Sequence, residues 1–99
     1  MSYLVSCSFD LKRASGDDYK NAYSDLEKIG LKRVVVSGSG GSFVVPTTMV
    51  IGELTGSSAV NVRDNILNLV KNTFKLRHFS SEIFVTVGGD WAWGVETTI

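Results

Sequence analysis

The residues best suited to chemistry close an alternating segment near the N-terminus. Alternation places apolar side chains on one face of a strand and puts Ser6, Ser8 and Asp10 on the other. Two hydroxyls and a carboxylate therefore lie in a row, and the basic pair Lys12 and Arg13 follows directly. Carboxylates at strand ends, beside cations and a loop, are common positions for binding and catalysis.

The other candidate residues have simpler interpretations beside the chemical one. Lys12, Arg13 and Arg77 could neutralise phosphates, but ordinary solvated charges would look the same. His78 could act as a general acid or base because its free pKa is near neutrality, whereas a lone histidine in a connection is more often simply exposed. Asp10 itself could bond nearby backbone amides at a turn.

Composition indicates one folded domain over residues 1–99. The chain is 43% hydrophobic and 10% aromatic, and its 10 basic residues balance 10 acidic ones, so nucleic acid binding would need a local patch. The single cysteine, Cys7, falls on the apolar face of the first segment, and alone it cannot form an intramolecular disulfide. With neither a signal-like N-terminus nor an apolar run of about 20 residues, the chain is expected to be cytoplasmic and to have no membrane contact.

Hydrophobic periodicity predicts two helices between short strands. Ser15 begins the first helix with a capping-box pattern and Gly30 ends it, while the segment Thr55-Gly56-Ser57-Ser58 supplies a turn and the N-cap of a second helix that runs to about Phe74. Pro46 cannot donate to a ladder and is placed outside a strand, whereas Gly52 is expected to mark a bulge within the strand that follows. The first predicted strand is the alternating segment of residues 3–12. The other predicted strands cover residues 32–37, 47 or 48 to 54, 82–87 and, as a short extra strand, 90–95.

This order, β-α-β-β-α-β with a C-terminal extra strand, predicts an α+β fold of the ferredoxin-like type. Four antiparallel strands would form one sheet with both helices on one face. The other face would be open to solvent, nucleic acid or a second subunit. Trp91 and Trp93 are expected to cover that face or to contact a partner, because two tryptophans seldom remain solvated.

The segment Val5-Ser6-Cys7-Ser8-Phe9-Asp10-Leu11-Lys12, a strand ending in Phe-Asp and a basic residue, resembles a superfamily of small bacterial ferredoxin-fold nucleases. It includes CRISPR-adaptation nuclease-like proteins, VapD toxins and GhoS antitoxin-type endoribonucleases. A first helix carrying Tyr19, Tyr23 and Leu26, and a length of 99 residues, fit the same superfamily. The glycine-rich connection and Pro46 have no counterpart in it.

The resemblance implies that Asp10 lies near its symmetry mate across a homodimer. There it would hold a divalent metal or position the cleaved phosphodiester. Two such carboxylates with Mg²⁺ could orient a water for in-line attack, with Ser8 as a further source of oxygen.

Two functions follow from these observations. The first is a homodimeric, metal-dependent endoribonuclease, or a nuclease-like protein, of a toxin–antitoxin or phage-defence system, with Asp10 central. The alternative is a non-catalytic module that binds protein or RNA through the open sheet face, such as a phage-encoded inhibitor or a regulatory subunit. The first-strand motif favours the nuclease, while the neutral charge and the few polar candidates favour the binding module.

Overall fold

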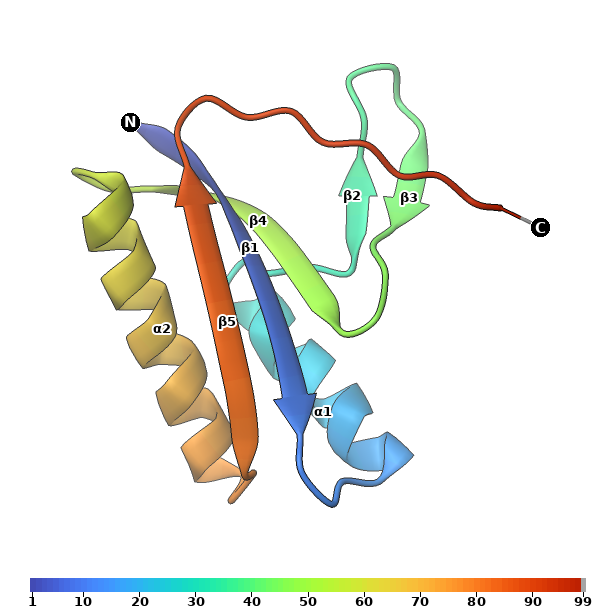
Figure 1. Cartoon of the computed structure of the whole chain (residues 1–99), viewed down its shortest axis with the longest axis vertical. Helices are drawn as coiled ribbons and strands as arrows, with labels where there is room; N and C mark the ends of the chain where they lie inside the picture. Colours follow the sequence, from blue (N-terminus) through green and yellow to red (C-terminus); the bar gives the residue numbers. More distant parts are fainter. Residues whose placement is uncertain (99) are drawn as a thin grey trace.

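The computed structural model describes residues 1–98 and has an α+β fold (Figure 1). Its elements in chain order are β1 (Ser2–Leu11), α1 (Gly16–Lys28), β2 (Val34–Val36), β3 (Ser42–Val44), β4 (Met49–Thr55), α2 (Ala59–Leu76) and β5 (Ser81–Gly88). None of the helices in residues 1–98 combines the length and apolar character needed to cross a membrane.

The strand β1 lies at the centre of a three-stranded antiparallel sheet in the order β4-β1-β5. Along β1, Cys7 pairs with Val50 of β4 on one side and with Val85 of β5 on the other. Side chains of directly paired residues lie on the same face of the sheet, so each β1 side chain lies between one side chain of β4 and one of β5.

The predicted four-stranded sheet is not what forms. The strand predicted over residues 32–37 touches β4 only at one bridge, between Lys32 and Ile51. Beyond Lys32 the chain turns away, and β2 pairs with β3 in a separate two-stranded sheet. The glycine-rich turn makes this local hairpin possible. Within it, the Gly40 N–H donates to the Ser37 carbonyl, and the Ser37 N–H donates to the Gly41 carbonyl. Two valines of this run are consequently exposed, Val34 to 49% and Val36 to 65%, while Val35 is half-buried.

Both helices pack on one face of the main sheet and form the core with β1. The five β1 side chains on that face are between 0% and 6% exposed. The core residues that the helices add are Ala22, Leu26, Val62, Ile66, Val70 and Phe74. Burial raises the pKa of the Cys7 thiol to about 11, which agrees with its predicted place as a small buried hydrophobe.

Each helix begins and ends with local hydrogen bonds that the sequence partly predicts. Ser15 and Asp18 form the predicted capping box of α1, and the Ser58 side chain accepts from the N–H of Asn61 at the start of α2. At the end of α1, Gly30 has φ +93° and donates to the Glu27 carbonyl, the arrangement of a Schellman motif.

The end of α2 repeats this motif without a glycine. His78 occupies the left-handed position at φ +61°. Its N–H donates to the Lys75 carbonyl, and the N–H of Phe79 donates to the Phe74 carbonyl. Phe79 also packs against Phe74, with ring centroids 5.8 Å apart. Tertiary contacts around Phe79 thus hold a histidine where glycine is usual.

Two further predictions are corrected. Residues 90–95 form no strand: within the described chain, everything after Gly89 lacks ladder partners, and the segment crosses the β2–β3 hairpin (Figure 1). Side chains hold it instead, because Trp93 packs edge-on against Phe43 at 6.0 Å between centroids. Gly52 marks no bulge, since the β1–β4 register is continuous through it.

Candidate functional site

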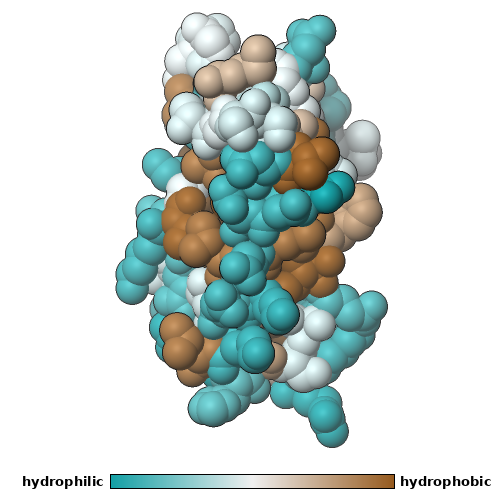
Figure 2. Space-filling view, turned by 90° about the vertical axis from the view of Figure 1, so that its left-hand side faces the viewer, coloured by the Kyte–Doolittle hydropathy of each residue, from teal (hydrophilic) through white to brown (hydrophobic). Residues whose placement is uncertain are grey.

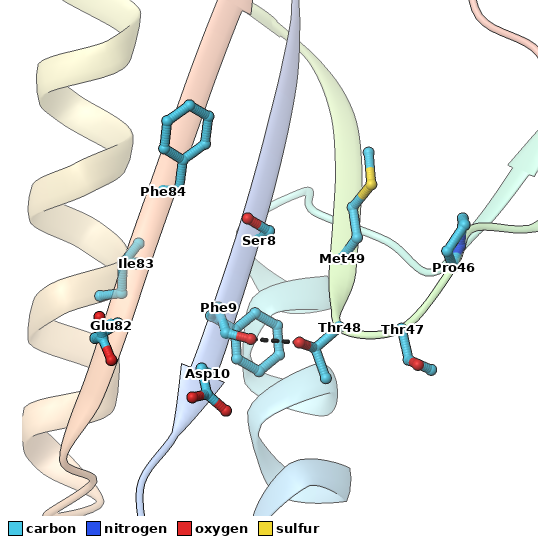
Figure 3. A pocket seen from close by; sticks show the side chains of 10 residues that line it. All are labelled: Ser8, Phe9, Asp10, Pro46, Thr47, Thr48, Met49, Glu82, Ile83 and Phe84. Atoms are coloured by element: carbon cyan, nitrogen blue, oxygen red, sulfur yellow. Dashed lines mark hydrogen bonds between the residues drawn. The ribbon is translucent and has the colours of Figure 1, made fainter.

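The candidate site is a shallow groove on the sheet face that the helices leave open, at the end where β1 stops and β5 starts (Figure 3). Its volume is about 560 Å³. The residues that line it are Ser8, Phe9, Asp10, Pro46, Thr47, Thr48, Met49, Glu82, Ile83 and Phe84. We call this hollow the Asp10 groove.

Asp10 occupies the last part of β1, where its carboxylate is held from two directions. Lys12 donates from Nζ to Oδ2 at 3.2 Å. The Tyr19 hydroxyl of α1 lies 3.2 Å from both Asp10 Oδ1 and the Leu11 carbonyl oxygen, so its single proton can be donated to either. The Leu11 N–H in turn donates to the Tyr19 hydroxyl at 3.1 Å. These contacts, first from Lys12 and then from Tyr19, hold the pKa of Asp10 below its ordinary value.

A second carboxylate lies directly opposite the first. Asp10 pairs with Glu82 across the β1–β5 ladder, so both side chains project from the open face. The Lys12 ammonium forms an ion pair with Glu82 as well as with Asp10. Both carboxylates raise the pKa of Lys12, Glu82 more than Asp10, so the lysine remains protonated at the centre of an acidic pair.

Mg²⁺ does not fit this set of donors. The Lys12 ammonium already lies against both carboxylates, in the position that a shared divalent cation would need. Across residues 1–98, no three acidic, histidine or cysteine side chains gather closely enough to hold a metal ion. We therefore assign no metal to Asp10 within a single chain.

The opposite wall of the groove comes from the turn before β4. The Thr48 hydroxyl donates to the Phe9 carbonyl, and the Phe9 N–H donates to the Thr48 carbonyl at 3.1 Å (Figure 3). Pro46 stays outside any strand, as predicted. On the floor, Ser8 lies in register between Met49 and Phe84, and the Phe84 side chain is 64% exposed.

The structure does not bring the predicted cations together. Arg77 belongs to the helical layer, where its guanidinium binds Asp25 of α1 through two bonds of 2.7 and 3.0 Å. That contact holds the pKa of Asp25 below its ordinary value. Arg13 is exposed in the turn after β1, at φ +49°. His78 is exposed at the end of α2, where its left-handed backbone conformation is part of the Schellman motif that ends this helix.

The predicted tryptophans lie at the other end of the open face. Trp91 and Trp93 line a second hollow with Leu4, Ile51 and the strand β2. Both are half-buried there. The structure thus uses them to cover this part of the chain's own sheet, and their contact with a partner remains a prediction.

Three residues near Asp10 are not indicated as site residues by the sequence pattern. Glu82 could be found only from the β1–β5 register, and Thr48 only from the β1–β4 register, because neither position is local to Asp10. Tyr19 packs against the core and also places its hydroxyl on the Asp10 carboxylate. A tyrosine one helical turn after the N-cap has a hydroxyl that can reach the preceding strand, which was the signal available.

The chain matches no protein-family model, and a search of curated proteins likewise returns no match.

Proposed function

We propose that this chain is a non-catalytic protein-binding module that uses the open sheet face around the Asp10 groove. The observation that carries the proposal is Phe84, a phenylalanine 64% exposed on a regular strand, beside a groove lined by hydroxyls and carboxylates. A large exposed apolar side chain with a polar rim is the usual anatomy of a binding surface.

The charges around Phe84 favour a protein over RNA. Asp10 and Glu82 outnumber Lys12, and the lysine is already paired with both. A phosphate backbone would meet net negative charge at the groove, whereas affinity for nucleic acid depends on unpaired Lys and Arg. The expected ligand is a segment with an apolar side chain for Phe84 and Met49 and a basic side chain for the two carboxylates.

Selection from a displayed random-peptide library tests this proposal. Enriched peptides should combine an aromatic or aliphatic residue with a neighbouring Lys or Arg. Their binding should be lost in Phe84→Ser and weakened in Glu82→Gln. Leu76→Ser is the matched control, because Leu76 is 83% exposed at the end of α2, outside the groove. Enrichment that survives Phe84→Ser would reject the proposal.

The second candidate is the homodimeric, metal-dependent endoribonuclease of a toxin–antitoxin or phage-defence system. The observation in its favour is an ionised carboxylate at a strand end beside three hydroxyl residues of the groove, Ser8, Thr47 and Thr48. One chain does not supply a fitting Mg²⁺ site, so this function requires donors from a second copy. Single-stranded and structured RNA should then be cleaved with Mg²⁺ by the native protein and not by Asp10→Ala. Absence of cleavage by either protein would reject it.

We extend the proposal to the finer fold class and to the cellular compartment of the protein. The order β4-β1-β5, both helices on one face and the Lys32–Ile51 bridge support a ferredoxin-like arrangement in which the fourth strand is reduced to one contact. A single buried cysteine supports a reducing compartment such as the cytoplasm.

A further inference from the structure

The outer edge of β5 offers backbone groups that nothing in the described chain pairs with. The Lys12 N–H donates to the Ser80 carbonyl, which determines which residue pairs of the antiparallel β1–β5 ladder are hydrogen-bonded. Because hydrogen-bonded pairs alternate, the even-numbered residues of β5 bond to β1. The N–H and C=O groups of Ser81, Ile83, Val85 and Val87 therefore point outward.

This edge also lacks the features that normally block pairing. β5 contains no proline and no lysine, and its one charged residue is Glu82. Along the edge, half-buried Ile83 and Val85 line two hollows with α2. Figure 2 faces the α2 side and shows hydrophobic surface interrupting the hydrophilic surface there. A long, regular and largely apolar edge is a template for another strand.

We propose that β5 pairs antiparallel with β5 of a second copy of this chain, about a two-fold axis through Phe84. In this register Ile83 lies opposite Val85 of the partner copy. The N–H and C=O groups of both residues point outward, so the two residues form a hydrogen-bonded pair. Phe84 meets its own counterpart at a non-hydrogen-bonded position on the open face. An aromatic pair of that kind stabilises a ladder and would cover part of a ring that is 64% exposed in one chain.

The charges on α2 are complementary under the same axis. Arg63 lines the hollow beside Val85, and Asp64 lines the hollow beside Ile83. Since Val85 pairs with Ile83 of the other copy, each Arg63 comes to face the other copy's Asp64. Within one chain these two side chains already form an exposed ion pair, with 2.9 Å from Arg63 Nη2 to Asp64 Oδ1. The second copy is therefore favoured over an unrelated strand, because the edge is complementary to itself.

This inference goes beyond the proposed binding function and shares Phe84 with it, because the ring would contact both its counterpart in the dimer and a bound segment. Edge pairing extends the sheet sideways, so the two Asp10 grooves remain on the same open face. It does not bring the two Asp10 carboxylates together, because each lies on a central strand. The peptide selection measures binding of a separate segment, and disulfide crosslinking measures pairing of β5, so failure of one proposal can be told from failure of the other.

Two cysteine variants test the register. In Phe84→Cys, the two α-carbons at the axis would be about 4.5 Å apart, within the range for a disulfide. Mild oxidation should therefore convert most of the protein to a covalent dimer. Thr86→Cys is the matched control on the same strand and face, with α-carbons about 14 Å apart, and should remain uncrosslinked. Equal crosslinking of both variants, or of neither, would overturn the proposed pairing.

Amide exchange of the native protein gives a readout without mutation. The outward N–H groups of Ile83 and Val85 should become protected as protein concentration rises, in parallel with a monomer-to-dimer shift in sedimentation. Protection of the β1 amides should not change. Sedimentation as a monomer at the concentrations used for NMR, with rapid exchange at Ile83 and Val85, would overturn the inference.

Discussion

The two edges of the main sheet differ in what closes them. On the β4 side, Lys32 and Ile51 exchange two backbone hydrogen bonds of 2.9 Å, and the Gly30 carbonyl lies against Gly52. On the β5 side, no described segment pairs with the outer edge. Both strands make long ladders with β1, so the contrast does not arise from the centre of the sheet.

The path of the chain after each helix explains the contrast. After α1, the chain passes the outer edge of β4 before it forms the β2–β3 hairpin. After α2, it becomes the edge strand β5 itself. The backbone N–H and C=O groups of a central strand are thus paired with both neighbouring strands. Those on the outer side of an edge strand are paired only if another segment of the chain runs along it.

The largest difference is expected between Gly52→Ala and Gly88→Ala. A β-carbon at Gly52 would lie 2.1 Å from the Gly30 carbonyl oxygen, so backbone must move, whereas at Gly88 it meets nothing within 4 Å. We expect Gly52→Ala to lower the free energy of unfolding by about 3 kcal/mol, and Gly88→Ala to change it by about 0.5 kcal/mol or less. Urea denaturation measures both, and equal losses would remove the contrast between the edges.

A smaller difference is expected between the two valines that flank Cys7. Val50 is fully buried on β4, whereas Val85 is half-buried on β5. Val50→Ala should cost about 2 kcal/mol and Val85→Ala about 1 kcal/mol, because the second site is already partly solvated. The measurement is urea denaturation at low protein concentration. If β5 pairs with a second copy, the cost at Val85 should grow with concentration while that at Val50 stays constant.

The two helix ends that lead toward these edges should respond with opposite signs. Gly30 and His78 both adopt left-handed conformations, at φ +93° and +61°. Gly30→Ala should destabilise the protein by about 1 kcal/mol, and His78→Gly should stabilise it by about 0.5 kcal/mol, since only glycine adopts this region without strain. Thermal unfolding measures both changes. A loss of stability in His78→Gly would mean that the imidazole makes contacts that outweigh the relief of strain.

The smallest effect concerns the exposed Asp10–Lys12–Glu82 cluster that joins β1 to β5. The lowered pKa of Asp10 means that its contribution to stability is complete above its ordinary pKa of about 3.9 and is lost as pH falls through the lowered value. In Lys12→Met, the carboxyl titration of Asp10 followed by NMR should move upward, toward the ordinary value. Unfolding at neutral pH should be unchanged within error, because exposed ion pairs contribute little. An unmoved titration would show that Lys12 does not set this pKa.

The sequence was a good guide wherever the signal was local. The capping box at Ser15, the end of α1 at Gly30 and the buried face of β1 are all confirmed, because each depends on neighbours within one or two helical turns or on strict alternation. The alternation also placed Asp10 on the open face. His78 in a left-handed conformation was not foreseen, because the contact between Phe79 and Phe74 outweighs the cost at that residue.

The other misses concern which strands pair. The run Val34-Val35-Val36 has the composition of a buried strand, yet its partner is the local β3 rather than the main sheet. The alternation after Gly89 suggested a strand, but no ladder partner reaches it. Glu82 becomes part of the candidate site only through a register between strands some 70 residues apart in sequence. Periodicity describes faces, and it carries no information on which strand lies opposite.

The central place of β1 has a consequence for how the protein is made. β1 is synthesised before every other described element, but its ladder partners β4 and β5 come much later in the chain. On the ribosome, β1 must therefore wait for its full set of ladder partners until β5 has emerged, since the sheet is built from contacts of long sequence separation. We expect nascent chains that end before Ser81 to be substrates for chaperones, and release of the chaperone to coincide with the emergence of β5.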